Sequence, residues 1–229
     1  MELGSLEIVN AEDQSKTGQA RKMIKSAILS KELAPGEGVT ERGLSVKFNI
    51  GRTPIRDALK QLAFEGWFVT LPNGGLVVAD YNYEDIEENF AVRAQLDAFA
   101  AAECAKHATP EIILKLNYYI SASKIAIDQA NWMQNAELEA CFHKCIVECS
   151  GNHYLVKLYE LVAGHMPKSY YLQMKNDAFI RTSLEEHKAI VEAIAAHDEI
   201  RAAECCINHM ARCIKSVKEI AQNAEKVTT

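Results

Sequence analysis

The chain of 229 residues has no long apolar run, and it contains only 11 glycines and 5 prolines. No stretch approaches the roughly 18 to 20 consecutive apolar residues that a membrane-spanning helix needs. Residues 1–16 also lack the apolar segment of a signal peptide. We therefore expect a soluble, cytoplasmic protein. The apolar content of 48% is enough for a sizeable core, and the length predicts one or two domains, of which we favour two.

Cysteine pairs with CxxC spacing are absent, although the chain contains seven cysteines: Cys104, Cys141, Cys145, Cys149, Cys205, Cys206 and Cys213. An odd number in helical sequence is most simply explained by reduced thiols. Cys141, Cys145 and Cys149 recur at every fourth position, which is typical of small apolar side chains on a buried helix face. Redox sensing is the alternative interpretation of this stripe.

The chain also lacks an overall positive charge, since its formal net charge is −6. The charge is unevenly distributed: residues 1–15 carry −4, residues 16–79 carry +5 and residues 80–229 carry −7. Attraction to nucleic-acid phosphates requires positive charge on the part that binds. Residues 16–79 are therefore the candidate DNA-binding domain, preceded by a flexible tail at 1–15.

Residues 49–62 predict a helix that begins directly after a tight turn. Pro54 lies near the first helical turn, a position where proline is favoured. Ile55, Leu59 and Leu62 then recur at helical spacing, so they share one apolar face. The segment is therefore expected to be an amphipathic helix with a defined start.

Arg52, Thr53 and Arg56 lie at the start of this helix and off its apolar face, so their side chains can reach an anion. A short helix at 41–48, with Thr40 as a plausible N-cap, precedes them. A strand, a turn and a second strand follow at 67–71, 72–75 and 76–79. This order predicts a winged helix-turn-helix whose second helix reads DNA. An isolated helix with merely solvated arginines is the alternative, and the order of elements argues against it.

After residue 80 the sequence has few glycines and no strand alternation, which predicts an all-α bundle of about six helices at 80–229. The whole chain is therefore expected to be mainly α, with a small β-hairpin wing. Helix 83–107 is expected to turn Ile86, Phe90, Leu96, Phe99 and Ala100 inward. Further helices are expected after Thr109-Pro110, at 135–149, from 153 towards 175, after a capping box at Thr182-Ser183-Leu184-Glu185, and from 198 or 199 to about 224.

Four residues of this bundle are candidate metal ligands. Glu139 and His143 are four residues apart, so both can face one point between helices. His187 and His209 lie on two other predicted helices among apolar neighbours. Three imidazoles and one carboxylate suit a borderline divalent metal such as zinc or nickel. Each histidine taken alone is more simply a core or surface residue.

Residues 28–78 resemble the winged helix of GntR-type bacterial transcription regulators. The matching pieces are Leu33-Ala34-Pro35-Gly36, Glu41-Arg42-Gly43-Leu44, the run from Gly51 to Leu59, Leu62, Glu65-Gly66 and Gly74-Gly75. The resemblance implies that double-stranded operator DNA is contacted by Arg42, Arg52 and Arg56 on bases or phosphates, by Thr53 on the backbone, and by Asn73, Gly74 and Gly75 in the minor groove. Gly51 departs from the family, which usually has a Ser or Thr N-cap there.

Residues 84–212 resemble the all-helical FCD effector domain of the FadR subfamily. The matching pieces are Arg93, Leu96-Asp97, Glu139-x-x-Phe142-His143, Ser150-Gly151-Asn152, Glu186-His187 and Asn208-His209-Met210. Members with this pattern hold a metal through one aspartate and three histidines, and many sense a small carboxylate that docks on the metal. Here Glu139 occupies the aspartate position. Arg93 is either a clamp for the effector carboxylate or part of an interhelical salt bridge.

These observations predict a homodimeric, ligand-responsive transcription regulator. We expect it to repress transcription and the effector to relieve that repression. The alternative is a metal-dependent hydrolase or lyase that uses the histidine cluster to activate water. That alternative leaves the winged helix unexplained, and the chain has no HExxH motif. A DNA-packaging protein has no need for the acidic second domain.

Overall fold

The computed structural model describes residues 15–30, 32–80, 83–163 and 176–228. Residues 1–14 of the tail expected at 1–15, and the expected continuation of a helix from 164 towards 175, lie outside these residues, whereas Ser15 is described and caps the first helix. The chain divides into two compact units, Met1–Tyr81 and Asn82–Thr229. Each unit is described by itself.

The first unit is a helix-turn-helix with a small antiparallel sheet, in agreement with the predicted fold class. Its elements are α1 (Lys16–Leu29), β1 (Gly38–Val39), α2 (Glu41–Phe48), α3 (Arg52–Phe64), β2 (Phe68–Thr70) and β3 (Leu76–Val78). The strand order is β1-β3-β2, with Val39 opposite Leu76 and Val69 opposite Val77. Strand β1 escaped prediction because two residues are too few for a recognisable alternation.

Local caps and a shared apolar core position α2 and α3. The Thr40 side chain caps α2, as predicted, by accepting a hydrogen bond from the Gly43 backbone N–H at 3.0 Å. Asn49 ends α2 in the left-handed conformation with a φ of 52°, which directs the chain into α3. Helix α3 packs on α1. The residues buried between and around them include Ala20, Ile24, Ile55, Leu59, Leu62 and Trp67.

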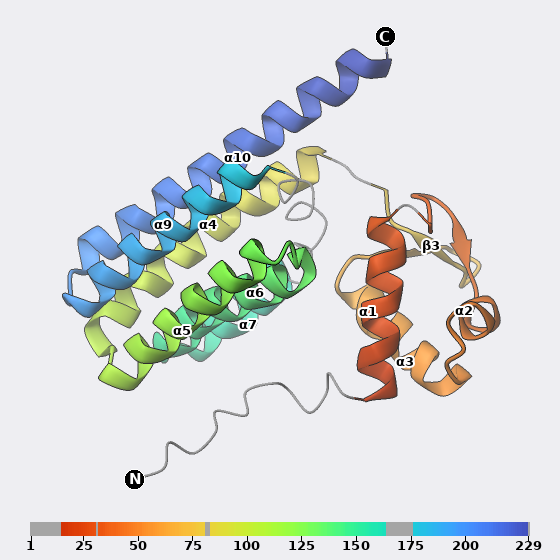
Figure 1. Ribbon diagram of the computed structural model, residues 1–229, viewed down its shortest axis with the longest axis horizontal. Helices are drawn as coiled ribbons and strands as arrows, with labels where there is room; N and C mark the ends of the chain where they lie inside the picture. Colours follow the sequence, from red (N-terminus) through yellow and green to blue (C-terminus); the bar gives the residue numbers. More distant parts are fainter. Residues whose placement is uncertain (1–14, 31, 81–82, 164–175, 229) are drawn as a thin grey trace. The chain divides into compact units, whose positions relative to one another are not determined.

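The second unit is a helical bundle. Its described helices are α4 (Tyr83–His107), α5 (Pro110–Asp128), α6 (Trp132–Cys149), α7 (His153–Ala163), α9 (Asp177–Ala195) and α10 (Glu199–Thr228). Helices α4, α9 and α10 run side by side, and α5, α6 and α7 form the other part of the bundle (Figure 1). Apolar residues from all six helices meet in one core. In the described part of the chain, no helix is long and apolar enough to cross a membrane.

Two predicted details of the helical unit are wrong. Helix α9 begins at Asp177 with Asn176 as its N-cap, so the expected capping box lies inside the helix. There the Thr182 hydroxyl donates a hydrogen bond to the Ala178 carbonyl at 2.9 Å, which shows that a cap-like sequence can be accommodated within a helix. Phe99 is 47% exposed, because the buried face of α4 is formed largely by alanines on its other side.

Candidate metal centre and nucleic-acid interface

The exposed start of α3 carries the side chains that the sequence assigned to DNA. Arg52 and Thr53 occupy the first two positions of the helix, and Arg56 lies one turn later. All three are exposed, whereas Ile55 and Leu59 are buried beneath them. Their donors therefore face solvent at the end of the helix where the backbone N–H groups also attract anions.

Arg56 is held by an acidic residue of the preceding helix. Its Nε lies 3.0 and 3.1 Å from the two carboxylate oxygens of Glu41, in the first turn of α2. Arg42, the next residue of α2, is exposed. The pair between Glu41 and Arg56 was not predicted, because the two residues are 15 positions apart and no helical periodicity relates them.

The tip of the wing is a tight turn between β2 and β3. The Asn73 side-chain carbonyl accepts a hydrogen bond from the Gly75 backbone N–H at 3.0 Å. Gly74 has a φ of +80°, a conformation that disfavours residues with a Cβ. Asn73 and Gly74 are exposed and Gly75 is partly buried. The three residues assigned to the minor groove thus form one turn with a defined backbone.

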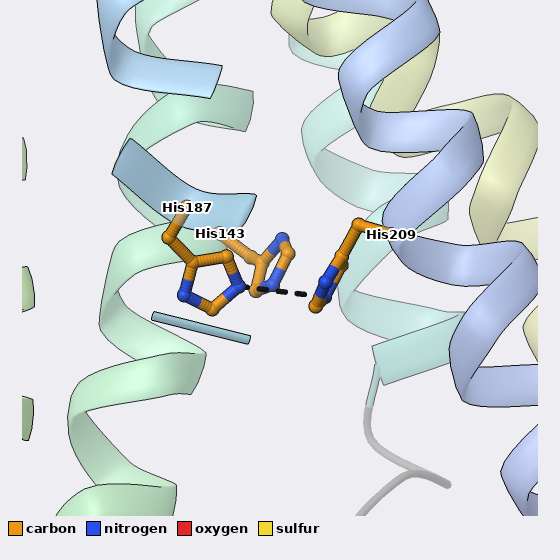
Figure 2. Close-up of side chains that lie close together, drawn as sticks. All are labelled: His143, His187 and His209. Atoms are coloured by element: carbon orange, nitrogen blue, oxygen red, sulfur yellow. Dashed lines mark hydrogen bonds between the residues drawn. The ribbon is translucent and has the colours of Figure 1, made fainter. Parts of the chain in front are cut away.

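Three histidines from three helices converge in the core of the bundle. His143 comes from α6, His187 from α9 and His209 from α10, and each offers one ring nitrogen within 4.8 Å of the others. The Nε2 atoms of His187 and His209 are 3.4 Å apart (Figure 2). The three residues are 4%, 1% and 4% exposed. The convergence that the sequence could only suggest is therefore present for the three imidazoles.

An ion pair with Glu186 fixes the orientation of the His209 ring. Its Nδ1 lies 2.7 Å from Glu186 Oε2 on α9, so Nδ1 carries the proton and donates it to the carboxylate. Nε2 is then the nitrogen that faces His187, and its lone pair becomes available to a metal once Nε2 loses its own proton. Arg212 donates two hydrogen bonds of 2.6 Å to the same carboxylate, from Nε to Oε1 and from Nη2 to Oε2. A carboxylate behind a ligating imidazole is the usual outer partner in protein metal sites.

Little in the sequence indicated this outer layer of residues around the histidines. Glu186 adjoins His187 in the sequence, yet it supports His209 on another helix. Arg212 lies three residues after His209 and could have been expected on a neighbouring part of the same face. Its bidentate pairing with a residue of α9 depends on how the two helices pack.

Burial controls the protonation of the cluster. It lowers the pKa of His143 and His187 well below the usual value, so both imidazoles are neutral and able to ligate a metal. Burial also acts to lower the pKa of His209, but Cys213 and Glu186 outweigh it and raise that pKa to about 10. Burial raises the pKa of Glu139 to about 7. Metal binding must therefore displace a proton from His209.

Glu139 lies beside the cluster on its outer side. Its Oε1 is 3.5 Å from His187 Nδ1, whereas the His187 nitrogen that faces His209 is Nε2. The carboxylate is buried and on the same face of α6 as His143, as the spacing predicted. The arrangement thus brings together three of the four candidate ligands and places the fourth behind one of them. Three nitrogen donors in a buried pocket fit zinc or nickel.

Arg93 is buried next to this cluster. Its Nε lies 3.1 Å from Asp97 Oδ2, one turn further along α4, so the salt bridge is within one helix and not between helices. The same Asp97 oxygen is 3.7 Å from His143 Nδ1. The Arg93 guanidinium also lies 5.5 Å from the centre of the Tyr159 ring. Asp97 therefore links Arg93 to His143, a connection that the sequence did not reveal.

Comparison with known proteins agrees with this geometry. Residues 16–78 match the family described as bacterial regulatory proteins, gntR family, and residues 88–212 match the FCD domain. The chain belongs to the GntR family, with an FCD domain as its helical unit. The resemblances identified in the sequence are therefore confirmed.

Several known proteins align with most of the length of this GntR protein. The HTH-type transcriptional regulator YdhC of Bacillus subtilis is 24% identical over 206 residues, covering 89% of this chain and 91% of YdhC. The HTH-type transcriptional repressor RspR of Escherichia coli is 22% identical over 204 residues, covering 89% and 90%. The structure of E. coli McbR/YncC superimposes with a TM-score of 0.72 at 20% identity, covering 90% of this chain and 98% of that one. The family and these relatives are transcription regulators, so the hydrolase or lyase alternative is not supported.

Proposed function

We propose that this GntR regulator is an operator-binding repressor whose DNA affinity is modulated by a small organic acid docked on a metal in the FCD domain. Residues 16–79 would bind DNA, and residues 80–229 would bind the effector and form the homodimer. The relative RspR is named a transcriptional repressor, which supports repression rather than activation. Two winged helices on successive half-sites are the arrangement that a dimer of such domains uses.

The observation that carries the proposal is the convergence of His143, His187 and His209 in the bundle core. Three buried imidazoles on three helices each place one ring nitrogen within 4.8 Å of the others, which is the convergence of nitrogen donors that a divalent metal needs. A divalent metal supplies one partner for all three. The Glu186 carboxylate behind His209 supports the same interpretation, because by holding Nδ1 it directs the other ring nitrogen, Nε2, towards the centre.

The effector part of the proposal rests on the cation beside the cluster. Arg93 is 7% exposed and lies on α4, connected to His143 through Asp97. A carboxylate bound at the metal would meet this guanidinium as a second, bidentate partner. Glu139 contacts the outer nitrogen of His187, which suits a supporting role for this carboxylate better than direct ligation in the present arrangement. A metal held by the three histidines would tie α6, α9 and α10 together, so a ligand on it could change how these helices pack.

The effector and the operator are coupled in both directions. If effector binding weakens operator binding tenfold, the coupling free energy is about 1.4 kcal/mol, and the operator must weaken effector binding by the same factor. An effector that binds free and DNA-bound protein equally cannot relieve repression. Measuring effector affinity with and without operator therefore tests the regulatory part directly.

The first experiment is elemental analysis of the purified full-length protein, followed by stripping and refilling with zinc or nickel. We expect close to one divalent ion per chain in the wild type and loss of that ion in His187→Ala. His153→Ala is the matched control, because His153 is exposed on α7 and lies outside the cluster. A wild type that takes up neither metal would end the proposal of a metal centre.

The second experiment joins sensing to DNA binding. The metal-loaded protein selects its operator from a random DNA library, and small carboxylic acids are screened by thermal shift with and without metal. We expect an acid that stabilises only the metal-loaded form and weakens binding to the selected operator. An acid that stabilises the metal-free protein equally would mean that the effector does not bind at the metal. Light scattering of the protein without DNA tests the homodimer separately.

A further inference from the structure

Two cysteines from different helices meet inside the helical unit. Cys104 lies one turn before the end of α4, and Cys149 is the last residue of α6. The Cys149 thiol donates a hydrogen bond to the Cys104 backbone carbonyl at 3.7 Å, and the two thiol groups also hydrogen-bond each other. We propose that these two residues form an oxidation site, in which a peroxide oxidises Cys149 and Cys104 then closes a reversible disulfide with it. This inference goes beyond the proposed function and does not depend on the metal centre.

The two side chains differ in their access to solvent. Cys149 is partly buried, whereas Cys104 is 0% exposed. A dissolved peroxide therefore reaches Cys149 first, and Cys104 lies behind it as the resolving thiol. Redox-sensing cysteines are accessible residues with thiolate character that lie next to such a second cysteine. The order of burial thus assigns a different role to each sulfur.

The contact between the thiols also makes the accessible one more reactive. The hydrogen bond from Cys104 lowers the pKa of the Cys149 thiol and outweighs burial, which acts to raise it. The same hydrogen bond, together with burial, raises the pKa of Cys104, so this thiol keeps its proton. The C-terminal end of a helix disfavours negative charge, so the Cys104 thiol is the group that stabilises a thiolate at Cys149. The pair therefore consists of one nucleophile and one proton donor.

The position of Cys149 in the backbone allows a disulfide to close. A disulfide needs sulfur atoms about 2.05 Å apart, and its Cα atoms are usually about 4.4–6.8 Å apart. Helix α6 ends at Cys149, and Gly151 directly afterwards has a φ of +66°, so the helix does not continue. Rotation of the two side chains and a small adjustment of this helix end therefore bring together two sulfurs that are already in contact.

The simpler alternative is that both cysteines only fill space in the core. Both contribute to the main apolar cluster of the bundle. Packing suffices for Cys145, which lies one turn before Cys149 on α6 and is 3% exposed. In the stripe of Cys141, Cys145 and Cys149, however, only Cys149 has a cysteine of another helix as a hydrogen-bond partner among the contacts described. Packing does not explain this pairing, because an apolar side chain fills the same volume.

The reaction consists of two balanced steps. The Cys149 thiolate attacks the peroxide, the O–O bond breaks, and the sulfur is oxidised to a sulfenic acid while the other oxygen leaves as hydroxide or alkoxide. The Cys104 sulfur then attacks the sulfenic sulfur. The S–S bond forms, the S–O bond breaks, and the leaving hydroxide takes the thiol proton as water. Two equivalents of an external thiol return both cysteines to the reduced state by exchange.

The experiment exposes the reduced, full-length protein to hydrogen peroxide in buffer free of iron and copper, and then labels the remaining thiols with a maleimide. We expect the loss of two of the seven thiols. Mass spectrometry of the digest should show a peptide linked through Cys104 and Cys149, and dithiothreitol should restore both thiols. This mapping uses the wild type, so it does not depend on the folding of any variant.

Two variants test the role of each sulfur. Cys104→Ala should leave Cys149 as a sulfenic acid that dimedone labels, because the resolving thiol is gone. Cys149→Ser should slow the loss of thiols at least roughly tenfold, because the reactive thiolate is gone. Cys205→Ser is the matched control, since Cys205 is also partly buried but burial raises the pKa of its thiol. We expect this control to form the disulfide like the wild type.

Each outcome decides for or against the pair. A linked peptide that dithiothreitol removes, absent from Cys104→Ala and Cys149→Ser and present in Cys205→Ser, supports the proposal. Retention of all seven thiols at a peroxide concentration that oxidises glutathione would overturn it. A disulfide between other cysteines, or a sulfinic acid at Cys149 without a disulfide, would also overturn it. The histidine site stands or falls separately, because none of these measurements depends on a bound metal.

Discussion

Glu186 provides the most direct test of how the histidine cluster is built. Its carboxylate accepts the Nδ1 proton of His209 at 2.7 Å and two contacts of 2.6 Å from Arg212. Glu186→Gln keeps the size and one accepting oxygen, but it removes the negative charge that makes His209 a stronger donor to a metal. Removing such an outer partner weakens metal binding roughly 10- to 100-fold, which corresponds to about 1.4–2.7 kcal/mol.

The assay is competition for zinc between the full-length protein and a chromophoric chelator. Glu185→Gln is the matched control, because this neighbouring carboxylate has a side chain 70% exposed and pairs only with Lys188, at 2.7 Å, among the contacts described. We expect the control to bind zinc like the wild type. Circular dichroism and urea unfolding of the metal-free proteins show whether either change disturbs the fold.

The reasoning fails if Glu186→Gln binds zinc as tightly as the control while both remain folded. That result would mean that the contact between Glu186 and His209 orients no metal ligand. A loss of zinc affinity together with a much lower unfolding midpoint in the metal-free state would point to a structural role for the pair with Arg212.

Three further predictions concern the DNA-binding unit. Arg52→Ala should weaken operator binding by roughly 1–3 kcal/mol in fluorescence anisotropy and leave the unfolding midpoint unchanged; an unaltered affinity would remove Arg52 from the interface. Glu41→Gln should alter operator affinity by releasing Arg56, while stability changes by less than about 1 kcal/mol because the pair is exposed; unchanged DNA binding would make the pair irrelevant to recognition. Leu59→Ala should destabilise the unit by roughly 2–5 kcal/mol in urea unfolding, since Leu59 is 2% exposed; a cost below 1 kcal/mol would contradict its place in the core.

Local patterns predicted the winged helix well. The start of α3, the apolar face formed by Ile55, Leu59 and Leu62, and the Thr40 cap all depend on residues within a few positions of one another. The helical period and the stereochemistry of turns act at that range, so the sequence expresses them directly. Strand β1 was missed because it is defined by its pairing with β3 and not by its own two residues.

Ambiguous local signals account for the errors in the bundle. The motif at 182–185 satisfies the rule for a capping box, but α9 already has an N-cap at Asn176. A cap marks a helix start only where the preceding residues are not helical. Phe99 was assigned to the core by its apolar character, although the neighbouring helices cover the opposite side of α4.

The sequence by itself determined the two-part organisation, the helices and their polar and apolar faces, because these follow from the fixed periodicity of a helix. It also placed Glu139 and His143 on one face of α6. Only the tertiary structure decided that His143, His187 and His209 meet, that Glu186 and Arg212 stand behind His209, and that Glu139 contacts the outer side of His187. The physical reason is that helix rotation and register are set by packing across the whole core, which no short stretch of sequence contains.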